Sequence, residues 1–120
     1  ADDDGKPAGN EKAEIDRMVT KGLEWLKRNQ AADGHWSAQG GQYPAAMTGL
    51  AGQALLMEGS TLREGKYSDQ IVKAVNWFVS NAQPNGLLCR PTESQYTYGH
   101  GFGLLFLASA YGEEEDTERR

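Results

Sequence analysis

Two segments of the chain have apolar residues at helical spacing on one side only. Both carry polar and charged residues on the opposite side, a pattern typical of amphipathic helices. In the first segment the apolar stripe comprises Ile15, Met18, Val19, Gly22, Leu23 and Leu26. In the second it comprises Ile71, Val72, Val75, Phe78, Val79 and Ala82. The sequence therefore predicts two half-exposed helices, over roughly 12–30 and 68–82, the second with Ser68 as its N-cap.

Two further segments are apolar on nearly every side. Between residues 45 and 57 the polar side chains are Thr48 and Gln53, and between 101 and 110 the polar side chain is Ser109. A helix that is apolar all round must be buried all round. Both segments also contain glycines, at 49, 52, 101 and 103, and each costs a helix about 1 kcal/mol relative to alanine. That cost favours close helix contacts, and we expect buried helices over roughly 45–58 and 99–111.

The predicted fold class is all-α, because no alternating apolar and polar run of useful length predicts a strand. The order is half-exposed, buried, half-exposed, buried, which predicts two consecutive helical hairpins. The second half of the chain also repeats the first at a constant separation along the sequence, which equals the separation of Lys21 from Lys73. We call this separation the repeat offset. The matched positions are Lys21, Trp25, Leu26, Asp33 and Gly34 with Lys73, Trp77, Phe78, Asn85 and Gly86. One residue later in register, Tyr43 matches Tyr96 and Gly59 matches Gly112.

The charges lie at the two ends of the chain. Of 120 residues, 17 are acidic and 12 basic, giving a net charge of −5, and the excess falls in residues 1–10 and 112–120. We expect disordered acidic tails over 1–10 and 113–120 around a body at 11–112, with repeats at about 14–59 and 67–112. The body is neutral and lacks the positive field that nucleic acid requires.

The composition also limits covalent and membrane features. Cys89 is the single cysteine, which excludes an internal disulfide and a multi-cysteine zinc site. The longest uncharged apolar stretch, near 101–111, is too short for a transmembrane segment. The chain starts at Ala1 without Met, which indicates a removed leader or a cut chain and favours an extracytoplasmic location.

Residues 21–36 resemble the QW repeat of the squalene cyclase and protein prenyltransferase superfamily. The motif positions fall on Lys21, Gly22, Trp25, Leu26, Gln30, Gly34 and Trp36. A degraded second copy retains Lys73, Trp77, Phe78 and Gly86, but Leu88 replaces the closing Trp. The resemblance covers about residues 14–112 and implies two hairpins of an α/α toroid, with outer amphipathic and inner apolar helices. The motif is structural: its glutamine and closing tryptophan hold the corner of a hairpin and carry no catalytic chemistry.

Catalytic members of that superfamily use motifs that this sequence lacks. It has no D-x-D-D proton donor, no D-D-x-x-D magnesium segment and no D-x-C zinc motif. Cys89, His35 and His100 supply ligand types for zinc, but they are far apart and need not converge. We therefore expect no cofactor and no metal, and the sequence favours a non-catalytic protein.

The candidate ligand residues lie at the starts of the two apolar helices. His100 is flanked by Tyr96 and Tyr98, and the equivalent place in the first repeat is held by Met47 and Thr48. A toroid would have its central mouth here, so His100 is a candidate ligand contact or acid/base group. The alternative is a helix-start histidine that is satisfied by a neighbouring carbonyl or tyrosine.

Three functions fit these expectations. The first is a non-catalytic repeat module, a fragment of a longer toroid, that binds a protein or an apolar isoprenoid-like ligand by its inner face. Its partners would be the remaining repeats or further copies of itself. The second is part of a terpene cyclase or prenyltransferase whose catalytic motif lies outside this chain. The third is a structural segment of an extracytoplasmic protein.

Overall fold

The computed structural model describes residues 8–90, 92, 93 and 95–112, and this part of the chain is all-helical. The helices are α1 (Ala8–Asn29), α2 (Pro44–Met57), α3 (Ser68–Asn81) and α4 (Tyr96–Gly112), and a short 3-10 turn, η2, covers Gln39–Gly41. The described residues contain no strand, only an isolated bridge between Ala38 and Gln42. The predicted all-α fold with four main helices is therefore confirmed.

Two helices begin earlier than the sequence predicted. Helix α1 begins at Ala8 rather than at about 12, so residues 8–10 of the expected N-terminal tail are helical. The remaining residues of the expected tails, 1–7 and 113–120, lie outside the described residues. Helix α4 begins at Tyr96 rather than 99, directly after Gln95, whose positive φ of 52° ends the preceding loop.

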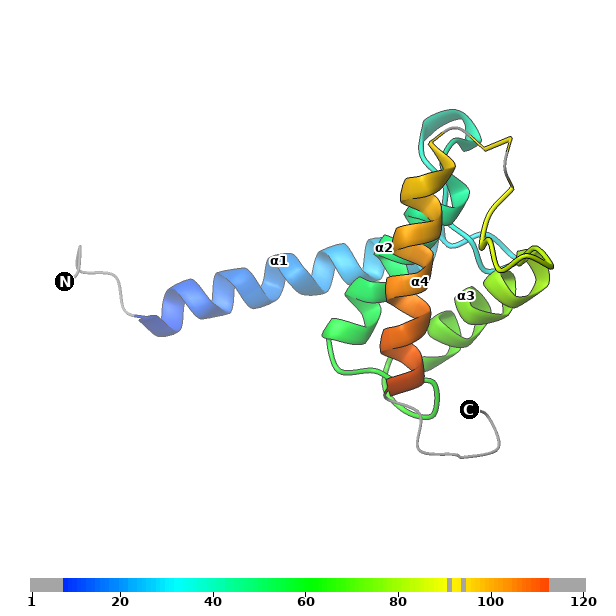
Figure 1. Cartoon of the computed structure of the whole chain (residues 1–120). Coiled ribbons are helices and arrows are strands. Elements are labelled where there is room, and N and C mark those ends of the chain that lie inside the picture. The colour runs from blue at the N-terminus through cyan, green and yellow to red at the C-terminus, as the bar shows by residue number, and fades with distance from the viewer. Residues whose placement is uncertain (1–7, 91, 94, 113–120) are drawn as a thin grey trace.

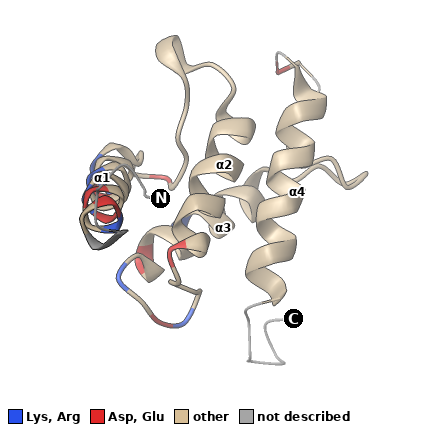
Figure 2. Cartoon of the chain, turned by 90° about the vertical axis from the view of Figure 1, so that its left-hand side faces the viewer, with Lys and Arg blue, Asp and Glu red and all other residues tan. Residues whose placement is uncertain are grey.

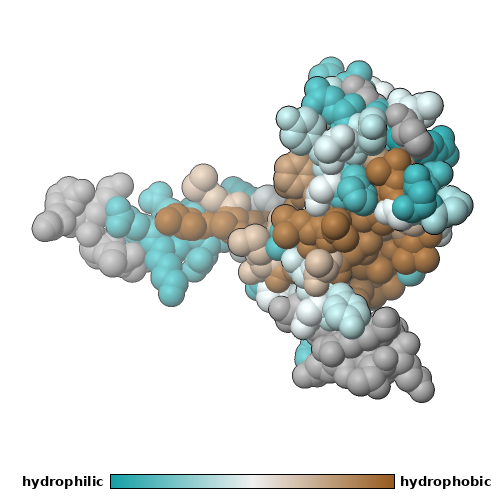
Figure 3. Space-filling view, in the orientation of Figure 1, coloured by the Kyte–Doolittle hydropathy of each residue, from teal (hydrophilic) through white to brown (hydrophobic). Residues whose placement is uncertain are grey.

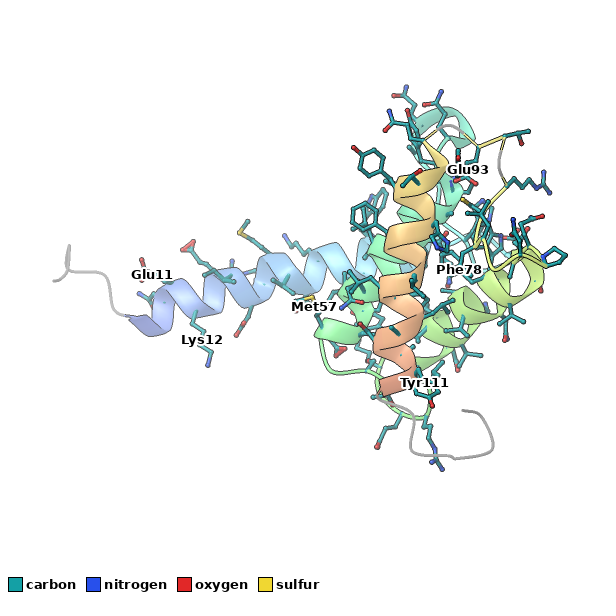
Figure 4. All side chains as sticks on the ribbon, in the orientation of Figure 1. Glu11, Lys12, Met57, Phe78, Glu93 and Tyr111 are labelled. Atoms are coloured by element: carbon teal, nitrogen blue, oxygen red, sulfur yellow. The ribbon has the colours of Figure 1, made fainter. Side chains whose placement is uncertain are left out.

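Helices α2, α3 and α4 form one compact body, and α1 projects from it (Figure 1). Helices α2 and α4 lie side by side along most of their lengths, and α3 packs against α2. Large buried side chains between these helices form the core, among them Leu55, Ile71, Phe78 and Phe106. Phe78 lies between α3 and α4 (Figure 4), with its ring 6.0 Å from that of Phe106.

Two glycines bring α2 and α4 into close contact. A Cβ atom on Gly49 would lie 2.6 Å from the backbone of Phe102, and one on Gly52 would lie 2.5 Å from the Phe106 ring. Gly103 is equally enclosed, because a Cβ there would lie 2.7 Å from the Phe78 ring. The expected close contacts are thus present at these three positions. They are absent at Gly101, where a Cβ would meet nothing within 4 Å.

The apolar residues of α1 are largely uncovered. Only its C-terminal half reaches α2, where Leu23 is buried and Leu26 half-buried. Further toward the N-terminus, Ile15, Met18 and Val19 are 59%, 71% and 52% exposed. Figure 3 shows this stripe along the side of α1 that faces the viewer. The apolar stripe of an amphipathic helix is normally buried against the rest of the protein. Here no described residue covers it.

Helix α4 is buried on one side only, so the expected all-round burial of this segment was wrong. Gly99, Gly103, Phe106 and Ala110 are buried toward the body. On other sides of the helix, Leu104 and Leu105 are 53% and 51% exposed. The reason is that α4 ends the array of described helices. Helix α2 lies between its neighbours and is mostly buried, although Leu50 and Met57 are exposed.

The connection from α2 to α3 contains a polar network around Tyr67. The expected N-cap role of Ser68 was wrong: the capping position is Tyr67, and the Ser68 hydroxyl donates instead to the Leu62 carbonyl at 3.1 Å. Tyr67 is buried, and its hydroxyl donates to Glu24 on α1 at 2.8 Å. Lys66 adds an ion pair to the same carboxylate at 3.2 Å. Figure 2 shows charges on α1 and this connection and none on α2 and α4.

These contacts shift two acidities in opposite directions. The hydrogen bond from Tyr67, with help from Lys66, lowers the pKa of Glu24. Burial, and then the hydrogen bond to Glu24, raise the pKa of Tyr67 to about 12. The folded state therefore favours the protonated phenol, which in the unfolded chain ionises at about 10. The contribution of Tyr67 to the free energy of unfolding is therefore fully present below about pH 10. It is lost as the pH rises toward about 12.

We expect Tyr67→Phe to flatten the loss of stability between about pH 10 and about pH 12, because the shifted phenol is removed. Glu24→Gln should flatten it in part, since it removes the carboxylate but leaves the burial. The measurement is the free energy of unfolding from urea titrations followed by circular dichroism at several pH values. Parallel curves for the wild type and Tyr67→Phe would contradict this prediction.

Candidate functional site

The turns that follow α1 and α3 make the same hydrogen bonds at positions separated by the repeat offset. After α1 the bonds run from Ala31 N–H to His35 O (2.8 Å), Gly34 N–H to Ala31 O (2.9 Å) and Asn29 Nδ2 to Trp25 O (2.8 Å). After α3 they run from Gln83 N–H to Leu87 O (2.7 Å), Gly86 N–H to Gln83 O (2.9 Å) and Asn81 Nδ2 to Trp77 O (2.8 Å). The two turns therefore share one backbone design.

The repeat offset also holds at the starts of α2 and α4. The residue before each helix has a positive φ, 55° at Tyr43 and 52° at Gln95. The sequence comparison had matched Tyr43 with Tyr96, one residue later. The structure instead pairs Tyr43 with Gln95, so that match was wrong. A residue with positive φ therefore precedes both apolar helices at the same repeat position.

Gln30 and Gly34 join the first turn to α3. The Gln30 side-chain amide donates to Gly34 O at 2.9 Å and to Gln70 O on α3 at 3.0 Å. Gly34 has a φ of 103°, and a Cβ there would lie 2.2 Å from the Lys73 carbonyl oxygen. Both residues therefore serve the contact between hairpins, and a side chain at Gly34 has no room.

Trp36 closes the corner of the first hairpin. Its side chain is 5% exposed, and its indole N–H donates to the Leu26 carbonyl of α1 at 2.8 Å. Three positions on α1 that belong to the QW-repeat resemblance are more open: Lys21 and Gly22 are exposed, and Trp25 is 55% exposed. The turn residues Gly34 and Trp36 are thus buried, whereas Lys21, Gly22 and Trp25 on α1 are exposed and Leu26 is half-buried.

Thr48 and His100 perform the same task in the two hairpins. Thr48 is fully buried, and its hydroxyl accepts from Trp36 N–H at 2.9 Å and donates to Trp36 O at 3.2 Å. His100 accepts from Leu88 N–H through Nδ1 at 3.2 Å, which leaves its proton on Nε2. The spacing from donor to acceptor along the chain is the same in both hairpins. Each side chain therefore satisfies a loop N–H that would otherwise lack a partner.

The five candidate ligand residues do not converge on one pocket. Tyr96 and Tyr98 lie in the first turn of α4 and are 44% and 62% exposed. Thr48 and His100 hold the loops as described above. Met47 is half-buried and lines a groove beside α1.

An apolar groove runs between α1 and α2. It consists of two hollows that share Leu26 and Ala54, one of about 590 Å³ and one of about 420 Å³. Met47, Ala51 and Ala54 of α2 line it, and Trp25 contributes from α1. Met57, at the far end of the second hollow, lies where α1 meets the end of α2 (Figure 4). We call this feature the α1–α2 groove.

The larger hollow has an uncharged lining with a polar margin. Its polar side chains are Asn29, His35, Ser37 and Gln39, at the end of α1 and in the loop that follows. Its size lies in the range of small-molecule sites, about 300–1,000 Å³. Sequence reasoning identified Met47 but missed Ala51 and Ala54, because a lining alanine has no pattern that separates it from a core alanine.

The residues considered for zinc are engaged in other contacts. His35 hydrogen-bonds Asp33 and stacks on Trp77 with ring centroids 5.5 Å apart. Cys89 is buried, and its thiol donates to Tyr96 O at 3.2 Å. Burial, and then the Glu93 charge, raise the pKa of that thiol. Within the described ranges, no three His, Cys, Asp or Glu side chains are grouped as a metal site.

Comparison with known proteins gives a partial similarity. The chain is 31% identical to human lanosterol synthase over 74 residues, which are 62% of this chain and 10% of that protein. No family model and no solved structure matches the chain. The similarity agrees in part with the squalene-cyclase resemblance of the sequence. Over the part of the chain that is described, no helix has the length and apolar character needed to cross a bilayer.

Proposed function

We propose that this chain is a non-catalytic, cyclase-like repeat module that binds an apolar partner, protein or isoprenoid-like ligand, in the α1–α2 groove. The observation that carries the proposal is the uncovered apolar lining of this groove. The matched turns after α1 and α3 support the repeat organisation. The partial similarity to lanosterol synthase supports the cyclase-like character.

The groove has the features that an apolar partner needs. Leu26, Ala51 and Ala54 provide an apolar floor along two helices, and Trp25 stands half-exposed beside them. Burying apolar surface contributes about 25 cal/mol per Å², so covering this floor with a farnesyl-type chain would favour binding. The polar margin suits a hydroxyl or a peptide group at the end of such a partner.

Of the candidate residues, Met47 has the clearest binding role in this proposal, because it faces the groove. Tyr96 and Tyr98 are exposed at the start of α4 and remain candidates for contact with a larger partner. Thr48 and His100 act as positioning groups for the loops that carry Trp36 and Leu88.

The test is binding of farnesol, followed by quenching of tryptophan fluorescence and by equilibrium dialysis. We expect saturable binding to the wild type and at least a tenfold loss in Ala54→Trp, which fills the groove. Ala82→Trp, at an exposed position after α3, is the matched control and should bind as the wild type does. No saturable binding to the wild type, or equal binding to both variants, would contradict the proposal.

The similarity to lanosterol synthase favours a second candidate, in which this region belongs to a terpene cyclase whose catalytic motif lies outside the chain. An aspartate-rich D-x-D-D segment in the same reading frame, together with cyclase activity of the complete product, would support it. A complete product without cyclase activity would contradict it.

A further inference from the structure

The second hairpin has a neighbouring helix that the first lacks. On α3, Ile71, Ala74 and Phe78 are fully buried, and α3 packs against α2. The residues one repeat offset earlier, on α1, are Val19, Gly22 and Leu26. Val19 is 52% exposed, Gly22 is exposed and Leu26 is only half-buried. The first hairpin therefore lacks the helix that α2 provides to the second.

The α1–α2 groove is the place of this missing helix. On α4, the side that faces α2 includes Gly99, whose Cβ would lie 3.0 Å from Ala45. It also includes Phe106, whose ring lies against Gly52. One repeat offset before Gly99 and Phe106 stand Met47 and Ala54, and both line the groove. A helix placed against α2 in the way that α2 is placed against α4 would therefore fill the groove.

Helix α4 itself carries the surface that such a helix needs. Helix α2 meets α4 through Gly49 and Gly52, and the positions one repeat offset later are Gly101 and Leu104. Leu104 is 53% exposed, and a Cβ on Gly101 would meet nothing within 4 Å. Figure 3 shows exposed apolar surface over α4. We call this side of α4 the free α4 face.

The side-chain sizes at these positions are complementary. Inside the chain, small Gly52 lies against the large Phe106 ring. Between the free α4 face and the groove, the same pair of positions holds large Leu104 and small Ala54. The summed volume of the two side chains is thus similar in both pairs, although the larger side chain is at the position of Phe106 in one pair and at the position equivalent to Gly52 in the other. Close-packed interfaces tolerate exchanges that conserve volume best. Neither α2 nor α4 contains an Asp, Glu, Lys or Arg, so no like-charge pair opposes their contact.

We propose that the α1–α2 groove binds the free α4 face of a second copy of this chain. This inference rests on the proposed function, because it names the apolar partner of the same groove. The contact is head-to-tail: each copy offers a groove and a face that are different surfaces. It continues the arrangement of α2 on α4 from one copy to the next, and association extends beyond two copies or closes as a ring.

The test uses two variants, each altered on one surface only. Val19→Lys places a charge in the groove, and Leu104→Lys places one on the free α4 face. Both positions are about half-exposed in the single chain, and circular dichroism checks that each variant folds. Sedimentation equilibrium should show the wild-type mass increasing with concentration and each variant remaining monomeric. Mixed in equal amounts, the two variants should form a heterodimer and nothing larger, because one groove and one face remain.

Other results would overturn this inference. A wild type that stays monomeric at millimolar concentration contradicts it, as does a variant that still self-associates or a mixture that stays monomeric. Farnesol binding separates this failure from that of the proposed function. If the wild type binds farnesol as a monomer, the groove binds an apolar ligand and only the second-copy proposal fails. If the wild type stays monomeric and binds no farnesol, the groove has no binding role and both proposals fail.

Discussion

Gly34→Ala is expected to destabilise the fold by about 3 kcal/mol or more, because two effects add at this position. The φ of 103° is strained for any residue with a Cβ, at a cost of about 1–2 kcal/mol. The new Cβ would also lie 2.2 Å from the Lys73 carbonyl oxygen, so the first turn must move away from α3. That movement stretches the hydrogen bond that the Gln30 side-chain amide donates across the contact to Gln70 O on α3.

The chain provides a matched control for Gly34→Ala. Gly86 holds the equivalent place in the second turn, with a φ of 94°, but a Cβ there would meet nothing within 4 Å. Gly86→Ala therefore introduces the backbone strain alone and should cost about 1–2 kcal/mol. Urea unfolding followed by circular dichroism measures both. Equal losses for the two variants would mean that the contact between the first turn and α3 contributes nothing measurable.

Trp36→Ala is expected to cost about 3–5 kcal/mol, the range for removing a large buried aromatic side chain. Trp36 is 5% exposed, and its indole supplies the bond to the Leu26 carbonyl. Its loss leaves a cavity at the hairpin corner and frees the end of α1, which has few other contacts with the body. We expect the helical signal of α1 to be lost together with the rest or before it.

Trp25→Ala is the appropriate comparison for Trp36→Ala. Trp25 is 55% exposed beside the groove, and its removal should cost no more than about 1 kcal/mol. Thermal and urea unfolding at low protein concentration give both values. A loss for Trp25→Ala that equals the loss for Trp36→Ala would show that the exposed tryptophan is buried in solution, and would contradict the described position of α1.

The sequence predicted the helices well because each has a local cause. Apolar spacing of three and four indicated the regions of α1 and α3, and an uncharged apolar run indicated those of α2 and α4. Boundaries were predicted less well: α4 begins directly after Gln95, whose positive φ no local sequence pattern indicates. The role of Ser68 failed for a related reason: the burial of Tyr67 sets the turn, and burial is not a local property.

The candidate site was predictable only in part. The internal repetition placed Met47 and Thr48 at the position equivalent to His100, but the side-chain chemistry differs, so the sequence could not show that Thr48 and His100 both accept a loop N–H. That shared task requires the loop and the helix start to meet in space. Ala51 and Ala54 were missed because they line a groove that no other described helix fills, and the sequence does not show which apolar residues remain uncovered.

The sequence alone determined the helical content, the order of amphipathic and apolar segments, and the glycines that allow close packing. These properties follow from side-chain size and hydrophobicity over a few neighbouring residues. Only the tertiary structure decided which apolar surfaces are covered. Helix α4 ends the array of described helices and α1 meets α2 only at its C-terminal half, so Leu104 and Val19 remain open to solvent although their sequence context resembles that of buried residues. Burial depends on how many neighbours a helix has, and that number is a property of the whole array.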